Sequence, residues 1–285
     1  MNEIVVGIDR SPASVQALVW ATREAALRNL PLRAVLVWHY LDQSHPGGED
    51  RFDPLYDEQA ARASLDEVIA TALGPDAAAA VQREVVCDLA PRALLEQSSG
   101  SALLVLGSRG TGGFKGLLLG SVSHQCLKHA TAPVAIIRSD WRPPAGDGPE
   151  RIVVGVDGST ASHDALRWAV VEGRLRGATV EAVHAWHIPS LVAQPFGVTT
   201  VDPAVFEEAA QRVVQAAVTE VGVPDVVPRL VQGDIVASLL DVSRDADLVV
   251  TAKRGVGGFK GLLLGSVSDQ LAQHATVPVV VIPES

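Results

Sequence analysis

The stretch GSRGTGGFKGLLLGSVS, residues 107–123, follows a short apolar run and contains six glycines. Gly107, Gly110 and Gly120 are separated by two and by nine residues, and Ser121 follows directly. Glycine lets backbone N–H groups approach an anion, because no side chain intervenes, and it adopts turn geometries that other residues resist. Ser121 stands where the N-cap of a helix is expected, and a helix N-terminus favours phosphate. The stretch therefore predicts a phosphate-binding loop between a strand and a helix.

The same stretch occurs a second time, since residues 252–268 read AKRGVGGFKGLLLGSVS. The last twelve residues of the two copies are identical. The segment RIVVGVDGS, residues 151–159, likewise repeats EIVVGIDRS, residues 3–11. A repeat this strong predicts two homologous units.

The boundaries of the two units follow from a segment without periodicity. Residues 139–150, SDWRPPAGDGPE, are rich in Pro and Gly, as is typical of a linker. The prediction is a first domain over residues 1–138 and a second over residues 151–285. Equivalent positions are 148 residues apart before the loop that follows the second strand and 145 residues apart after it.

Short apolar runs alternate with helical patterns in the first unit. Ser11 and Pro12 are typical of an N-cap and a first helical residue. Strands that are apolar throughout and alternate with helices predict an α/β fold with a parallel sheet covered on both faces. The predicted strands are 4–8, 32–38, 81–86, 102–106 and 134–137, and the predicted helices are 12–28, 55–73, 91–97 and 122–129.

An acidic residue ends the first strand of each unit, Asp9 and Asp157. In open parallel sheets, ligands bind beyond the carboxyl ends of the strands, where the winding direction reverses. Asp9 and the loop from Gly107 lie at such ends, so they converge if the first and fourth strands are neighbours. The alternative is that the aspartate only caps the following helix.

The glycine loops differ from two well-known phosphate-binding motifs. Lys115 and Lys260 are followed by glycine, whereas a Walker loop has Ser or Thr there. The dinucleotide fingerprint follows the first strand of its unit, but these loops follow the fourth. A loop that merely turns the chain remains the alternative for each copy taken alone.

The composition excludes several classes of function. A chain of 285 residues is long enough for two domains. Its net charge of −10 opposes binding to nucleic acid or to anionic lipid. The N-terminus MNEIVVGIDR lacks the basic start and the length of a signal peptide, and no apolar run reaches membrane-spanning length. A cytoplasmic protein without nucleic-acid or membrane partners is expected.

The side chains that usually catalyse reactions form no recognisable arrangement. The spacing of the eight histidines does not suit a metal array, and no metal site is expected from side chains. No serine lies in a G-x-S-x-G elbow, and no Cys/His or paired-carboxylate arrangement recurs in both units. The sequence favours a binding protein over an enzyme.

Taken together, the strand ends GIDRS and GVDGS, the G-x2-G-x9-G-S spacing and the LLLGSVS segment resemble the universal stress protein family over nearly the whole chain. More narrowly, they resemble its tandem two-domain form from actinobacteria. The resemblance implies two doubly wound domains, each with a five-stranded parallel sheet of strand order 3-2-1-4-5. It also implies binding of ATP, with Mg carried on its phosphates, in a protein that acts in stress responses rather than as an enzyme.

The resemblance assigns an ATP-binding set to each unit by position. The set of the first unit is Gly7, Asp9, Val37, Gly107, Ser108, Arg109, Gly110, Thr111, Gly112, Gly113, Gly120, Ser121 and Val122. The set of the second is Gly155, Asp157, Ala185, Ala252, Lys253, Arg254, Gly255, Val256, Gly257, Gly258, Gly265, Ser266 and Val267. Ala252 departs from the pattern because it replaces the first glycine of the loop. Its methyl group is expected either to crowd the nucleotide or to force a slightly different backbone, so the second site is expected to be the weaker one.

The resemblance further implies how the units associate. The last strands, Val134–Ile137 and Val279–Ile282, are expected to pair antiparallel within the chain, which would cover two apolar edges. A homodimer and unidentified protein partners are further expectations. Two alternatives remain open: a slow ATPase or other nucleotide-using enzyme, and a scaffold that binds no nucleotide.

Overall fold

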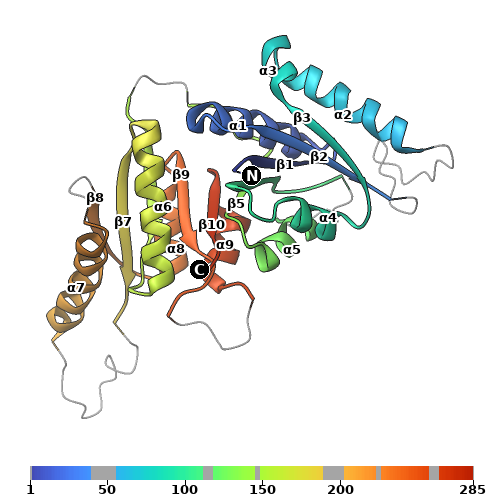
Figure 1. The fold of residues 1–285 in the computed structure, drawn as a ribbon. Coiled ribbons are helices and arrows are strands. Elements are labelled where there is room, and N and C mark those ends of the chain that lie inside the picture. The colour runs from blue at the N-terminus through green and yellow to red at the C-terminus, as the bar shows by residue number, and fades with distance from the viewer. Residues whose placement is uncertain are drawn as a thin grey trace.

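The computed structural model describes residues 2–39, 56–111, 118–144, 148–188, 202–222, 226–256 and 263–284. Figure 1 shows two α/β units joined along one continuous sheet. Within the described ranges, no helix combines the length and the apolar character that a membrane crossing requires.

The first strand and helix form as their sequence predicts. Strand β1 (Ile4–Ile8) is buried along its whole length. The hydroxyl oxygen of Ser11 then accepts a hydrogen bond from the backbone of Ser14 and caps helix α1 (Pro12–Arg28), whose first residue is proline. The helix ends at Asn29 in the left-handed conformation, with φ of 51°.

The remaining elements of the first unit follow the predicted order with one addition. The short helix α3 was not predicted, although Pro75 stands at its first turn. These elements are β2 (Leu32–Trp38), α2 (Glu58–Ala72), α3 (Pro75–Ala80), β3 (Gln82–Cys87), α4 (Ala90–Gln97), β4 (Leu103–Gly107), α5 (Ser121–His129) and β5 (Val134–Ile137).

The second unit repeats this order without a counterpart of α3 among its described residues. Its elements are β6 (Arg151–Gly155), α6 (Thr160–Arg176), β7 (Thr179–Trp186), α7 (Pro203–Val221), β8 (Val226–Gln232), α8 (Ile235–Ser243), β9 (Leu248–Ala252), α9 (Ser266–His274) and β10 (Val279–Ile282).

The strands form one sheet of ten in the order β3-β2-β1-β4-β5-β10-β9-β6-β7-β8. Each unit therefore has the expected order 3-2-1-4-5, and its strands pair in parallel. The only antiparallel pairing among the described strands is between β5 and β10, with Val280 opposite Ala135. The predicted fold class and the predicted pairing of the last strands are confirmed.

Helices cover both faces of this sheet. Helices α1, α2, α6 and α7 pack on one face, where apolar residues of both units form a single cluster. Helices α4, α5, α8 and α9 pack on the other face in a second cluster. Alternate residues of a strand point to opposite faces, so Val5 joins the second cluster while Ile4 and Val6 join the first.

The segment predicted as a linker packs against the domains at both ends. Trp141 is buried in the core on the α1 face. Glu150, at the other end, is paired with Arg23 and Arg176. The boundaries at residues 138 and 151 stay a prediction.

Candidate functional site

A cavity of about 260 Å³ opens at the carboxyl end of the sheet in the first unit. It lies where β1 and β4 are neighbours, because Val6 of β1 pairs with Val105 of β4. The chain continues from β1 toward β2 on one side and from β4 toward β5 on the other. This is the reversal point at which open parallel sheets bind ligands.

Asp9 holds the glycine loop against the end of β1. One carboxylate oxygen of Asp9 accepts a hydrogen bond from the backbone N–H of Thr111, with Oδ2 and N 3.2 Å apart. The other oxygen, Oδ1, accepts a hydrogen bond from the N–H of Ser11 at 3.0 Å. Asp9 therefore joins the loop to the start of α1, and the predicted convergence is confirmed.

Gly110 makes room for this contact. A Cβ atom at Gly110 would lie 2.4 Å from Oδ2 of Asp9, so a side chain there would displace the Asp9 carboxylate. Glycine is needed at positions 107 and 7 for packing rather than for the contact with Asp9. A Cβ at Gly107 would lie 2.7 Å from the backbone of Ala13 and Ser14, and one at Gly7 would meet Leu106 at 2.7 Å. These two glycines allow close packing of the protein against itself.

The start of helix α5 differs in one detail from the prediction. Gly120 is the N-cap, and Ser121 is the first helical residue, so the expected cap at Ser121 is wrong. The same holds for Gly265 and Ser266 in the second unit. Because Gly120 has no side chain, no side-chain hydrogen bond caps α5. The N–H groups of the first helical turn therefore have no partner from the cap side chain, and the first two helical residues, Ser121 and Val122, line the cavity.

Two bonds fix the helix start relative to the loop. The N–H of Gly120 donates to the carbonyl oxygen of Ser108 at 2.7 Å. The hydroxyl of Ser123 donates to the carbonyl oxygen of Gly107 at 2.7 Å. Ser108 is itself buried, and its carbonyl oxygen belongs to this backbone framework.

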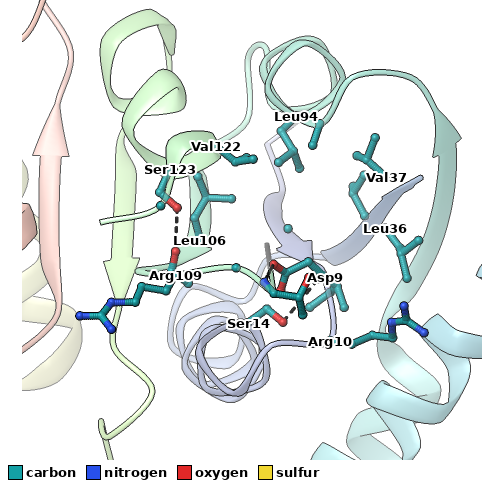
Figure 2. A pocket seen from close by; sticks show the side chains of 18 of the residues that line it. Asp9, Arg10, Ser14, Leu36, Val37, Leu94, Leu106, Arg109, Val122 and Ser123 are labelled. Atoms are coloured by element: carbon teal, nitrogen blue, oxygen red, sulfur yellow. Dashed lines mark hydrogen bonds between the residues drawn. The ribbon is translucent and has the colours of Figure 1, made fainter. Parts of the chain in front are cut away.

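The wall of the cavity opposite Asp9 is apolar. Figure 2 shows Val37, Leu94, Leu106 and Val122 around the upper part of the cavity, with Asp9 below them. Trp38 and Tyr56 also line it, and their rings meet edge to face with centroids 5.9 Å apart. The cavity thus has an apolar slot beside a polar loop.

Ten of the thirteen residues predicted for the first site line this cavity. Ser108 does not, and Gly112 and Gly113 lie outside the described residues. The ten are Gly7, Asp9, Val37, Gly107, Arg109, Gly110, Thr111, Gly120, Ser121 and Val122.

Several lining residues were not predicted, among them Leu94 and Leu106. A signal for Leu94 exists in the sequence, because Leu239 repeats it 145 residues later. Leu239 approaches Gly155 as Leu94 approaches Gly7: a Cβ built on either glycine would meet a methyl group of that leucine within about 3.3 Å. Comparison of the two units beyond the glycine motif would have found it.

The second unit repeats the arrangement of loop and aspartate. Oδ2 of Asp157 accepts a hydrogen bond from the N–H of Val256 at 2.7 Å. Burial raises the pKa of Asp157, but hydrogen bonds from Ser159 and Val256 outweigh this and hold the pKa below its usual value.

The other predicted residues of the second site differ in exposure. Ala185 and Ala252 are buried, whereas Val256 is exposed. The N–H of Lys253 donates to Ile282, and the carbonyl oxygen of Lys253 accepts from Gly265. Burial lowers the pKa of the Lys253 amine, and Arg254 lowers it further. Gly257 and Gly258 lie outside the described residues.

The model of the universal stress protein family matches residues 1–138 and 149–283. The chain belongs to the universal stress protein family.

Full-length relatives of this universal stress protein occur in mycobacteria. A universal stress protein of Mycolicibacterium smegmatis is 35% identical over 287 residues, which cover 98% of this chain and 96% of that protein. A universal stress protein of Mycobacterium tuberculosis is 34% identical over 297 residues, covering 99% of this chain and 96% of that protein. These relatives share the tandem organisation over their whole length.

A solved structure shows the same fold. The crystal structure of a universal stress protein from Archaeoglobus fulgidus superposes with a TM-score of 0.68 at 19% identity, covering 100% of this chain and 99% of that one.

Proposed function

We propose that this universal stress protein binds an adenine nucleotide, ATP, in the cavity of the first unit and acts as a nucleotide-dependent regulator in stress responses. The observation that carries the proposal is the hydrogen bond between Asp9 and the N–H of Thr111. This bond holds the glycine loop beside the end of β1. The loop, the uncapped start of α5 and the apolar slot thereby surround one cavity.

The apolar slot suits a flat base. Ligand sites combine apolar walls with a few polar groups that fix orientation. Val37, the last residue but one of β2, lies on the face of the sheet that α4 and α5 cover, and these helices contribute Leu94 and Val122 to the same slot. A purine ring between these side chains would bury apolar surface against them.

The polar half of the cavity suits ribose and phosphate. A ribose hydroxyl would donate to the Asp9 carboxylate, whose oxygens retain lone pairs beside the two backbone bonds that they accept. Phosphate groups would meet the free N–H groups at Ser121 and Val122 and the positive end of the α5 dipole.

A metal ion would come with the phosphates. In the part of the chain that the structure describes, no three His, Cys, Asp or Glu side chains gather in a way that could hold a metal ion. Mg bound to the nucleotide needs no such group, because it retains waters and takes phosphate oxygens as ligands.

The geometry of Asp9 favours binding over catalysis. Both of its oxygens accept backbone hydrogen bonds that hold the loop in place. A general base must be able to take up a proton from a bound reactant, and protonation of Asp9 would weaken these two bonds. We therefore propose a binding protein rather than an ATPase.

Release of bound nucleotide tests the proposal directly. The purified protein is denatured, the supernatant is analysed for adenine nucleotide, and the refolded or nucleotide-free protein is titrated with ATP by calorimetry. If the protein neither releases nucleotide nor binds ATP, it is a scaffold that binds no nucleotide. Sustained ATP hydrolysis well above the spontaneous rate would point to an enzyme.

The variant Gly120→Ala locates the site. A Cβ there would meet its nearest neighbours at 3.5 Å, so the fold should tolerate it. The methyl group would enter the loop, and we expect ATP affinity to fall by about tenfold, roughly 1.4 kcal/mol. Gly74→Ala is the control, since a Cβ at Gly74 meets nothing within 4 Å and lies outside the cavity.

A further inference from the structure

The two units differ at equivalent positions of their loops. Arg10, which lines the first cavity, corresponds to Gly158, and Gly107 corresponds to Ala252. Ser139, just after β5, corresponds to Glu284, just after β10. The second unit thus lacks the arginine of position 10, has Lys253 where the first unit has Ser108, and gains one carboxylate and one methyl group.

Asp157 accepts more hydrogen bonds from the described residues of its own unit than Asp9 does. Its Oδ1 accepts hydrogen bonds from both the N–H of Ser159 at 3.0 Å and the hydroxyl of Ser159 at 2.6 Å. The equivalent hydroxyl of Ser11 donates to the carbonyl oxygen of Arg109 instead, at 3.0 Å. Fewer lone pairs of Asp157 are thus open to a ligand.

The second loop also lies closer to its aspartate. The N–H of Val256 is 2.7 Å from Oδ2 of Asp157, whereas the N–H of Thr111 is 3.2 Å from Oδ2 of Asp9. A Cβ built on Gly255 would lie 2.0 Å from Oδ2 of Asp157, compared with 2.4 Å for Gly110 and Asp9. The loop of the second unit is therefore closed more tightly over the strand end.

Glu284 holds the arginine of the second loop. The guanidinium of Arg254 donates from Nε and from Nη2 to the two carboxylate oxygens of Glu284. This two-point geometry is the one by which arginine binds a phosphate group. A carboxylate of the chain itself therefore occupies the guanidinium of the loop arginine in the second unit, whereas Arg109 has Ser139 at the equivalent place.

From these differences we infer that the second unit is closed by its own carboxylates, Asp157 and Glu284, and that one chain binds one nucleotide, in the first unit. The inference rests on the proposed function. The first unit responds to the nucleotide, while residues 254–256 of the second keep their contacts with Asp157 and Glu284 whether or not nucleotide is present.

Calorimetric titration of the full chain with ATP tests the stoichiometry. We expect one binding event per chain, abolished or weakened about tenfold by Gly120→Ala and unchanged by the equivalent Gly265→Ala. Two events, or one event that only Gly265→Ala weakens, would overturn the inference while leaving the proposed function intact. No binding at all would overturn the proposed function, and this inference with it.

A double variant tests whether Glu284 and Ala252 are what closes the second unit to nucleotide. The variant Glu284→Ala with Ala252→Gly removes the competing carboxylate and the added methyl group. We expect a second, weaker binding event per chain, with the first event unchanged. If this variant is folded by circular dichroism and still binds only one ATP, Glu284 does not close the loop and the inferred cause is wrong.

Discussion

The guanidinium of Arg176 in helix α6 contacts the carboxyl group of Glu24 in helix α1, and both side chains are almost wholly buried between the two units. Arg28 of α1 forms the reciprocal pair with Glu172 of α6. Arg176 follows Arg28 by 148 residues, and Glu172 follows Glu24 by the same number. The repeat thus places the arginine of each unit on the glutamate of the other.

Further contacts complete this charged cluster. Arg176 donates to Glu150 at 2.8 Å and to Glu172 at 2.5 Å. Its guanidinium lies 5.8 Å from the ring centroid of Trp20, and that of Arg28 lies 5.1 Å from the ring centroid of Trp168. Arginine over an aromatic face adds cation–π attraction to the ion pairs.

The cluster predicts a pH dependence of stability. Burial raises the pKa of Glu24 from 4.5 to about 8; Glu172 also raises it, and Arg176 and Arg28 lower it. Between these pH values the folded chain keeps a proton that the unfolded chain has lost. The free energy of unfolding should therefore fall as pH rises through this window, by at most about 1.4 kcal/mol per pH unit.

Urea denaturation at several pH values from about 5.5 to 8 measures this slope. Glu24→Gln keeps the shape and cannot lose the proton, so the slope should flatten in this variant. An equally steep decline in Glu24→Gln would show that another group is responsible.

Removing Arg176 should be costly. Arg176→Met removes the cation that contacts Glu24, Glu150 and Glu172 together, while Arg28 still contacts Glu24 and Glu172 and Arg23 still contacts Glu150. Removing one partner of a buried pair typically costs roughly 3–5 kcal/mol, and because those arginines remain we expect a loss of about 3 kcal/mol, at the lower end of this range. Chemical denaturation measures it. Arg62→Met is the control, because the Arg62 side chain is half exposed and its pair with Glu58 is 3.9 Å long. Similar losses in both variants would contradict the importance of the buried cluster.

Gly107→Ala should destabilise the first unit by its packing alone. The new methyl group would lie 2.7 Å from the backbone of Ala13 and Ser14 at the start of α1. Such overpacking costs roughly 1–3 kcal/mol, and it should lower the melting temperature without any ligand present. A variant as stable as the wild type would mean that α1 can shift, as the second unit accommodates Ala252.

Arg10→Gly should remove backbone strain. Arg10 has a φ of 67°, in the left-handed region, and its equivalent Gly158 has a φ of 84°. The left-handed conformation costs a residue with a side chain roughly 1 kcal/mol. Glycine has more conformational freedom in the unfolded chain, which offsets part of this gain, so the free energy of unfolding should rise by a net ~0.5 kcal/mol.

Thermal unfolding of Arg10→Gly measures this gain, and Gly158→Ala provides the reverse change. The new Cβ at Gly158 would also meet Val213 at 3.3 Å, so this variant should be less stable than the wild type. Equal stability of all three proteins would show that the left-handed backbone stores no strain here.

Local signals predicted most of the fold. Ser11 and Pro12 begin α1 as expected, and β1, β2 and β5 have the predicted bounds. The strand order followed from the resemblance rather than from the runs themselves. Helix α3 was missed because its six residues, PDAAAA, are too few to show a helical periodicity.

The cavity was predicted less completely than the fold. The backbone contacts of Asp9 and Gly110 follow from where the strands end, and the glycine motif indicated them. Leu94 and Tyr56 reach the cavity from elements far away in sequence, so no local pattern indicates them. The cap of α5 depends on the dihedral angles of Gly120 rather than on residue preference, which favours Ser121.

The antiparallel pairing of β5 with β10 takes place inside one polypeptide. Association of the two halves is therefore independent of protein concentration, because the covalent connection supplies each with its partner. In an assembly of identical subunits every substitution appears on both sides of the symmetry axis. Fusion removes that constraint, so one half can specialise as a receptor while the other becomes a permanent structural support.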